Sequence, residues 1–106
     1  MGEVSPVQQN AQAMRRSIRY VGPILRASEI TGALIEAIQQ DNPDKEVKVV
    51  DQGGYVRVMV PNRCVIHRTT IESVLGRSFR MPGELEIYLS SFSGKIQTGS
   101  EDVVWY

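Results

Sequence analysis

The sequence is poor in the residue types from which most active sites and metal sites are built. Its 106 residues include one cysteine and one histidine, too few for an internal disulfide or for a zinc site of thiolate and imidazole ligands. No apolar run approaches the roughly 20 residues that cross a bilayer, and the N-terminus lacks the apolar stretch of a secretory signal. These absences predict a protein of the reducing cytoplasm that binds neither a metal nor a membrane.

The chain also has no net charge. Twelve basic residues balance twelve acidic ones, so the formal net charge is +0. A neutral chain has no long-range field with which to collect phosphates, and this disfavours generic binding to nucleic acids or anionic membranes. The charges are nevertheless segregated along the chain, because residues 1–26 and 52–80 are basic and residues 27–51 and 81–106 are acidic. This segregation predicts patches of opposite sign on the surface.

Catalytic motifs are also absent. The glycine pair at 53–54 is not followed by the lysine and the helix start of a phosphate-binding loop. His67 and Cys64 fall in one short β-rich run, without the second polar partner that orients a general base or activates a nucleophile. Glu84 and Glu86 have the spacing of one strand face, where acidic pairs usually meet solvent. The sequence therefore predicts a non-catalytic protein that acts by binding.

The N-terminal half begins with a predicted tail. Polar residues interrupt the apolar positions of residues 1–19, which we expect to be flexible. Residues 20–25 form a short apolar run broken by Gly-Pro, and proline removes one ladder hydrogen bond, which predicts an edge strand. Ser28 is expected to cap a helix that continues to Asp41, since apolar residues recur at spacings of three and four. Pro43 prevents the helix from continuing.

The middle of the chain has the alternation of strands. Residues 46–51 and 55–60 flank the glycine pair and predict a hairpin, and residues 64–68 predict a third strand. A Thr-x-x-Glu capping-box spacing then predicts a short helix over about 70–75, which ends at a glycine.

The C-terminal part is predicted to be all strand. Residues 84–89 alternate in hydrophobicity, the small residues 90–94 interrupt them as a loop, and residues 95–98 and 103–106 predict a strand pair. The element order is β-α-β-β-β-α-β-β-β, an α+β fold with mainly antiparallel neighbours. The expected core comprises Ile30, Leu34, Ile38, Val56, Val58, Ile71, Leu75, Leu85, Ile87 and Leu89.

Five segments carry a resemblance to a known family. They are VGPILRA (21–27), DNPDKEV (41–47), YVRV (55–58), LGRSF (75–79) and ELEIYLSSFSGKIQ (84–97). In this order and spacing they resemble the effector (coupling or regulatory) proteins of bacterial multicomponent diiron monooxygenases, in particular those of the toluene 4-monooxygenase type. This chain departs from that pattern in its longer N-terminal tail and in Ser91 and Ser93, where alanines are common.

The resemblance implies a fold and a function. The fold is a compact α+β domain over residues 20–106, with two small, mainly antiparallel sheets and two to three helices. The function is that of a cofactor-free subunit, a monomer when free, which binds the diiron hydroxylase near its active site. There it couples electron transfer and O₂ activation to hydroxylation of an aromatic or alkene substrate.

The contact with the hydroxylase is predicted to lie on the small-residue segment at 90–94, helped by three arginines. Phe92 offers one large apolar anchor, although it could equally fill the domain's own core. The expected partner-binding residues are Arg57, Arg68, Arg77, Ser90, Ser91, Phe92, Ser93 and Gly94.

Two other function classes stay open on the residues alone. A small enzyme would draw its catalytic group from His67, Cys64 and the acidic residues. A protein- or nucleic-acid-binding module would use the arginine-rich segment 52–80, and its binding to oligonucleotides would depend on salt.

Overall fold

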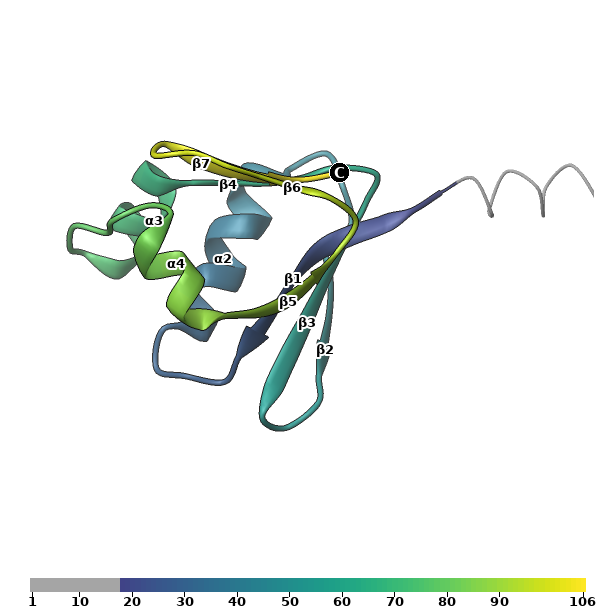
Figure 1. Ribbon diagram of the computed structural model, residues 1–106, viewed down its shortest axis with the longest axis horizontal. Coiled ribbons are helices and arrows are strands. Elements are labelled where there is room, and N and C mark those ends of the chain that lie inside the picture. The colour runs from purple at the N-terminus through teal and green to yellow at the C-terminus, as the bar shows by residue number, and fades with distance from the viewer. Residues whose placement is uncertain (1–17) are drawn as a thin grey trace, which may run out of the picture.

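Two antiparallel sheets and three helices make up the computed structural model, which describes residues 18–106 (Figure 1). The first sheet has four strands in the order β2 (Lys48–Asp51), β3 (Tyr55–Pro61), β1 (Tyr20–Arg26) and β5 (Leu89–Ser93). The second has three strands in the order β4 (Cys64–His67), β7 (Asp102–Trp105) and β6 (Ile96–Thr98). The helices are α2 (Thr31–Asp41), α3 (Arg68–Leu75) and α4 (Gly83–Tyr88). The predicted α+β class with two small antiparallel sheets is confirmed.

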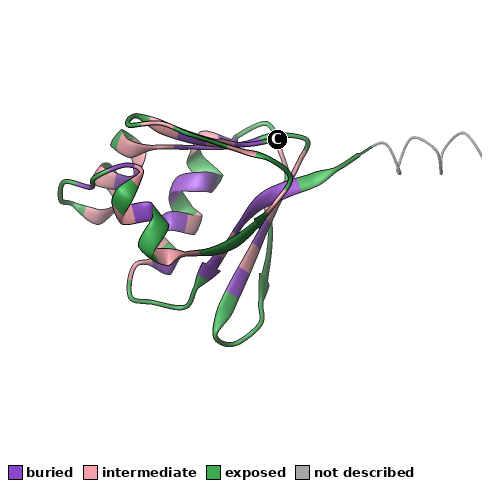
Figure 2. Ribbon diagram, in the orientation of Figure 1, coloured by how far each residue is buried: buried purple, intermediate pink, exposed green. Residues whose placement is uncertain are grey.

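A single hydrophobic core joins both sheets to the helices. Figure 1 shows α2 between the two sheets, with α3 and α4 beside it. Leu34 and Ile38 of α2 are fully buried in the same cluster as Val58 of β3 and Trp105 of β7. Figure 2 shows buried residues on α2 and on strands of both sheets. None of the helices in residues 18–106 is long and apolar enough to cross a membrane.

The predicted tail, residues 1–19, lies outside the described residues except for its last two. Arg19 is fixed to the loop that follows β3, because its N–H donates to Asn62 Oδ1 at 3.2 Å and its carbonyl accepts from the Asn62 N–H at 2.6 Å. The described chain therefore enters β1 already bonded to the domain.

The first helix ends where the sequence predicts and begins three residues later. Ser28 Oγ accepts the Ile30 N–H at 3.2 Å and lies 2.9 Å from Thr31 Oγ1. Thr31 Oγ1 in turn donates to the Arg26 carbonyl at 2.7 Å. The Ser28 hydroxyl thus contacts the turn before α2 and the side chain of its first residue but caps no backbone N–H of the helix, which runs from Thr31 to Asp41.

β1 is a central strand, which corrects the prediction of an edge strand. It pairs with β3 on one side and with β5 on the other. The ladder with β3 is interrupted at Gly22 and Pro23, so the missing proline N–H falls in a gap between bonds. Gly22 is required at this point, because at φ 144 a Cβ atom would clash with the Val58 carbonyl oxygen.

The hairpin of β2 and β3 and the phasing of β3 are confirmed. Val56, Val58 and Val60 are buried, whereas Tyr55 and Arg57 occupy the opposite face. The predicted final strand pair corresponds to β6 and β7, which pair antiparallel.

The short middle helix is confirmed as α3 and ends at Gly76, but its capping box does not form. The N-cap residue is His67, and no side chain caps the helix. Glu72 instead turns its carboxylate toward the loop after the helix, where it accepts the Phe79 N–H at 2.9 Å.

The strand predicted over residues 84–89 is wrong, because residues 83–88 form α4. Leu85, Ile87 and Leu89 alternate as in a strand, but Leu85, Tyr88 and Leu89 also have the spacings of three and four of a helix face. The structure uses the second pattern. Leu85 is buried and Tyr88 and Leu89 pack partly buried against the core, whereas Ile87 is 62% exposed. The expectation that Ile87 is a core residue is therefore also wrong.

The loop predicted over residues 90–94 is mostly a strand, because residues 90–93 belong to β5 and Ser91, Phe92 and Ser93 pair with β1. The register shifts between Ile24 and Leu25, which marks a bulge in this ladder. An edge strand has one neighbour only, so small polar residues are tolerated there. The other expected core residues are buried or partly buried: Ile30, Leu34, Ile38, Val56, Val58, Ile71, Leu75, Leu85 and Leu89.

Candidate partner-binding surface

The predicted partner-binding residues occupy two regions of the structure. Arg57 and residues 90–93 belong to the four-stranded sheet, and Gly94 follows its last strand. Arg68 opens α3, and Arg77 lies just after its end. The structure therefore brings Arg57 and the serine-rich segment together and leaves Arg68 and Arg77 in a separate cluster.

β1 connects Arg57 to the serine-rich segment. Ile24 is paired with Arg57 on one side and with Ser91 on the other. Directly opposite residues of antiparallel strands place their side chains on the same face. Arg57 and Ser91 therefore share one sheet face, with Ile24 between them.

Phe92 lies at the edge of this sheet and does not fill the core. It is paired with Pro23 and is 38% exposed, whereas Pro23 is fully buried. The serines at 90 and 91 are exposed, and Ser93 is partly buried. The segment thus presents one aromatic ring among small polar side chains, as an anchor for a partner requires.

Gly94 is explained by contacts within the domain. Its φ is 90, and a Cβ atom there would lie 2.6 Å from Val21 Cγ1 and 2.7 Å from the Tyr106 carbonyl oxygen. The next residue, Lys95, exchanges two backbone hydrogen bonds with Tyr106, at 2.7 and 2.9 Å. Gly94 therefore lets the turn after β5 approach the first and last strands of the domain itself.

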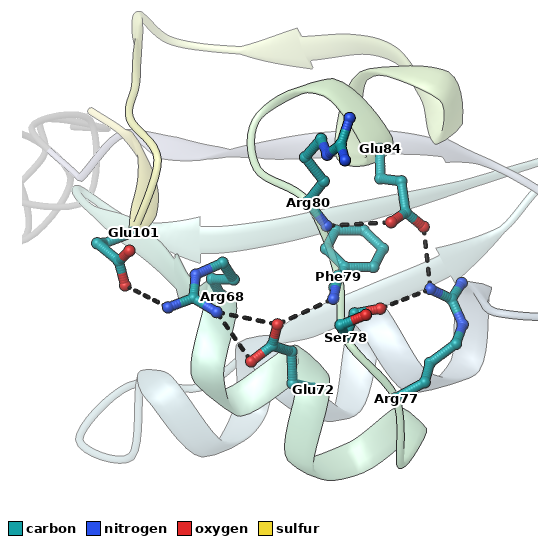
Figure 3. A network of polar contacts seen from close by, with 8 residues as sticks. All are labelled: Arg68, Glu72, Arg77, Ser78, Phe79, Arg80, Glu84 and Glu101. Carbon is teal, nitrogen blue, oxygen red and sulfur yellow. Dashed lines mark hydrogen bonds and ion pairs between the residues drawn. The ribbon is translucent and has the colours of Figure 1, made fainter.

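Arg68 belongs to a network of polar contacts between α3 and the loop that follows it (Figure 3). Its guanidinium donates to both carboxylate oxygens of Glu72 at 2.9 Å and to Glu101 at 2.8 Å. These two carboxylates raise the pKa of Arg68. The Phe79 N–H, and then Arg68, lower the pKa of Glu72. The charge of Arg68 is therefore balanced within the domain.

Arg77 is held in a similar way by α4. Its guanidinium donates to Glu84 at 3.0 Å and to the Ser78 carbonyl at 2.8 Å. The other oxygen of Glu84 accepts the Arg80 N–H at 3.0 Å, and this bond is the main reason why the pKa of Glu84 is lowered. Ser78, Phe79, Arg80 and Glu84 line an open hollow of about 450 Å³ beside these contacts.

The candidate catalytic residues are not assembled into a site. Cys64 is buried, and burial raises the pKa of its thiol to about 12, so it stays protonated and unreactive at neutral pH. His67 is half exposed on β4, with Nδ1 4.0 Å from Asp102 Oδ2. Within residues 18–106, no group of three or more His, Cys, Asp or Glu side chains could hold a metal ion.

The exposed aromatic residues on the same sheet face as Arg57 were not predicted as part of the site. Tyr20 and Tyr55 are 40% and 45% exposed, and Val50 is 40% exposed. The signal was present in the alternation of β3, which places Tyr55 and Arg57 on the face opposite the buried valines. Nothing in the sequence showed that no element of residues 18–106 packs over the tyrosines on this face.

Comparisons with known proteins agree on one family. A model of the MmoB/DmpM family matches residues 19–106. The chain is 41% identical over 86 residues to the alkene monooxygenase system effector subunit of Xanthobacter autotrophicus (strain ATCC BAA-1158 / Py2), and this match covers 81% of the chain and 84% of the relative.

Two solved structures of a phenol hydroxylase–regulatory protein complex also contain a similar chain. One matches with a TM-score of 0.73 and 25% identity, covering 82% of this chain and 97% of the other. The second has a TM-score of 0.66 and 28% identity, covering 82% and 98%.

Proposed function

Because the chain belongs to the MmoB/DmpM family, we propose that it is the effector subunit of a multicomponent diiron monooxygenase and binds the hydroxylase component of that enzyme. The observation that carries this function is the family match, which extends over residues 19–106. The named relatives are effector or regulatory components of an alkene monooxygenase and a phenol hydroxylase. The protein is accordingly a non-catalytic part of its complex.

A domain without a catalytic site changes the reactivity of a partner by binding one conformation of that partner more tightly than another. A preference of about 1–3 kcal/mol shifts such an equilibrium by roughly 5- to 150-fold. A domain seated over an active-site entrance also excludes water and delays the escape of reactive intermediates. These two effects account for coupling without any cofactor on the effector.

For the contact itself we propose the sheet edge formed by β5, together with Arg57. Residues 90–92 are exposed, and Ser91 shares a row with Arg57 across β1. We assign Arg68 and Arg77 a supporting part at the α3–α4 end, because both guanidinium groups already bond to carboxylates of the domain. Replacing Ser91 and Ser93 with bulky residues should therefore weaken hydroxylase binding more than Arg68→Ala or Arg77→Ala.

The substrate type and the cellular location are narrower proposals. A toluene 4-monooxygenase type of complex would hydroxylate an aromatic ring, and product analysis of the assembled enzyme tests this directly. A cytoplasmic location is supported by the single, buried, unpaired thiol of Cys64, which is typical of a reducing compartment.

The alternative function, a small protein- or nucleic-acid-binding module built on residues 52–80, is not favoured, because the family match over residues 19–106 supports an effector. Two of the arginines in this segment, Arg68 and Arg77, are paired with carboxylates. Paired guanidinium groups contribute little to the phosphate binding on which such a module depends.

Titration of the hydroxylase with the purified protein tests the proposed function. We expect a complex in sedimentation velocity and a rate of product formation that rises and saturates as the protein is added. The isolated protein should carry no stoichiometric iron, zinc, flavin or nucleotide and should show no turnover alone. Absence of both a complex and a rate increase with the hydroxylase of its own system would contradict the function.

A further inference from the structure

One face of the four-stranded sheet is exposed to solvent in residues 18–106. Arg57 is paired with Val50 on one side and with Ile24 on the other. Ile24 is paired in turn with Ser91, so that one row crosses all four strands. Figure 1 shows the helices gathered on the other side of this sheet, toward the core. We call the exposed side the outer sheet face, and its defining residues are Tyr20, Ile24, Val50, Tyr55, Arg57 and Ser91.

The outer sheet face carries large apolar side chains that the domain does not cover. Tyr20, Val50 and Tyr55 are 40%, 40% and 45% exposed. Lys48 Nζ lies 4.6 Å from the centroid of the Tyr20 ring, so side chains of β2 and β1 meet across β3. Several exposed apolar and aromatic residues on one continuous face are typical of a protein-binding surface.

The same face is basic. Arg57 lies at its centre, and the register places Lys48 opposite Met59 and Arg26 opposite Tyr55 on this side. The four strands contain one acidic residue, Asp51. It is paired with buried Val56 and therefore belongs to the opposite face. The outer sheet face thus presents three cations and no carboxylate from its own strands.

Arg57 has an unused donor in this surface. Its Nε atom is buried and has no hydrogen-bond partner in residues 18–106. A buried donor without an acceptor is costly, and a planar guanidinium is best satisfied by a carboxylate that accepts two parallel bonds. The described part of the domain therefore supplies no acceptor for this donor. Because Nε is buried, a partner carboxylate would bind the guanidinium through its two Nη atoms.

We propose that the outer sheet face docks on an acidic surface of the hydroxylase, with a hydroxylase carboxylate bound to Arg57 and apolar hydroxylase side chains packed against the rings of Tyr55 and Tyr20 elsewhere on the same face. This inference rests on the proposed function and adds the surface and the chemistry of its partner. It is continuous with the β5 edge, because Ser91 belongs to both.

A second copy of the chain does not fit this face. A two-fold contact would place the same patch of each copy against the other. The three cations of one copy would then lie against the same three cations of the other, with no carboxylate from these strands between them, and like charges brought together in an interface are repulsive. A partner that carries carboxylates between apolar side chains satisfies both the charge and the aromatic rings.

Hydroxylase binding by single variants tests the docking surface. The dissociation constant of the fluorescently labelled full-length protein for the hydroxylase of its own system should rise about 30-fold or more in Arg57→Gln and about tenfold in Tyr55→Ala. Arg57→Lys keeps the positive charge but cannot donate two parallel hydrogen bonds to one carboxylate, so its affinity should lie between those of wild type and Arg57→Gln. Arg63→Gln, an exposed arginine outside this face, serves as the matched control and should bind within about twofold of wild type. Thermal melting of each variant shows that it is folded.

The outcomes separate this inference from the function on which it rests. If wild-type protein stimulates the hydroxylase while folded Arg57→Gln and Tyr55→Ala bind as tightly as wild type, the docking surface is wrong and the function stands. If wild-type protein neither binds nor stimulates the hydroxylase, both fail. Self-association that Arg57→Gln abolishes, or an oligonucleotide that displaces the hydroxylase, would also overturn the inference.

Discussion

The side-chain amide of Asn42 makes two hydrogen bonds to the backbone of Val65, as a neighbouring β-strand would. Asn42 Nδ2 donates to the Val65 carbonyl at 2.8 Å, and Asn42 Oδ1 accepts the Val65 N–H at 3.1 Å. β4 is an edge strand of the three-stranded sheet, so this amide covers part of an edge that no strand occupies. Nδ2 also donates to the Ile38 carbonyl at 2.7 Å, which joins the end of α2 to β4.

Asn42→Ala should therefore destabilise the domain by about 2–4 kcal/mol, because it leaves buried backbone groups without partners. Gln39→Ala, an exposed position on the same helix, should change the free energy of unfolding by no more than about 0.5 kcal/mol. Urea unfolding followed by circular dichroism measures both. Equal stability of the two variants would show that the Asn42–Val65 pair contributes nothing.

Alanine substitutions at Gly94 and Gly32 should have opposite effects on the stability of the domain. Gly94→Ala should destabilise by about 1–3 kcal/mol, because its φ is 90 and a Cβ atom would press on Val21 and Tyr106. Gly32 lies in α2 with nothing within 4 Å of an added Cβ, so Gly32→Ala should be neutral or stabilise by up to about 1 kcal/mol. Thermal unfolding of both variants tests this contrast, and a stable Gly94→Ala would refute the close packing of the turn after β5.

The Cys64 thiol should be unreactive in the folded protein. Burial raises its pKa from 9.0 to about 12, so the thiolate is scarce at pH 8 and no reagent reaches it. Alkylation by iodoacetamide should be slow in buffer and fast in denaturant. Because the folded-state pKa is the higher one, the stability contributed by the protonated thiol is complete below pH 9 and is lost as the pH rises toward 12. Rapid alkylation under native conditions would contradict this burial.

The Glu72 carboxylate should make the domain sensitive to acid. The Phe79 N–H, followed by Arg68, holds the pKa of Glu72 below its usual 4.5. Because the folded-state pKa is the lower one, this contribution to stability is present above about pH 4.5 and is lost as the pH falls. Glu72→Gln should flatten the loss of stability between neutral and acidic pH, and Glu86→Gln, at an exposed position, should not. The same acid sensitivity in wild type and Glu72→Gln would exclude this role.

The sequence correctly predicted the elements whose hydrophobic spacing fits only a helix or only a strand. The apolar spacing of α2 and the alternation of β3 both place their buried residues correctly, since each pattern is long enough to identify its period. Residues 84–89 are ambiguous because Leu85 and Leu89 satisfy both a strand and a helix face. The choice of a helix depends on contacts with the core and on the bonds that Glu84 makes to Arg77 and Arg80.

The candidate site was less predictable, because it depends on which strands are neighbours. Gly-Pro in β1 indicated an edge strand, yet the interrupted ladder allows the strand to lie between β3 and β5. That central position is what places Arg57 and Ser91 in one row. The pairing of Arg68 with Glu72 follows from their i,i+4 spacing in α3, but the pairs Arg68–Glu101 and Arg77–Glu84 depend on loops whose course the sequence does not reveal.

The yield of hydroxylated product per NADH consumed is the sharpest test of whether this protein is an effector of the hydroxylase. It is measured with the hydroxylase and reductase of the same system, in the presence and absence of this protein. We expect that NADH oxidation without the protein gives little product, and that one equivalent per hydroxylase active site raises both the rate and the product yield per NADH. Equal yields with and without the folded protein would contradict its assignment as an effector.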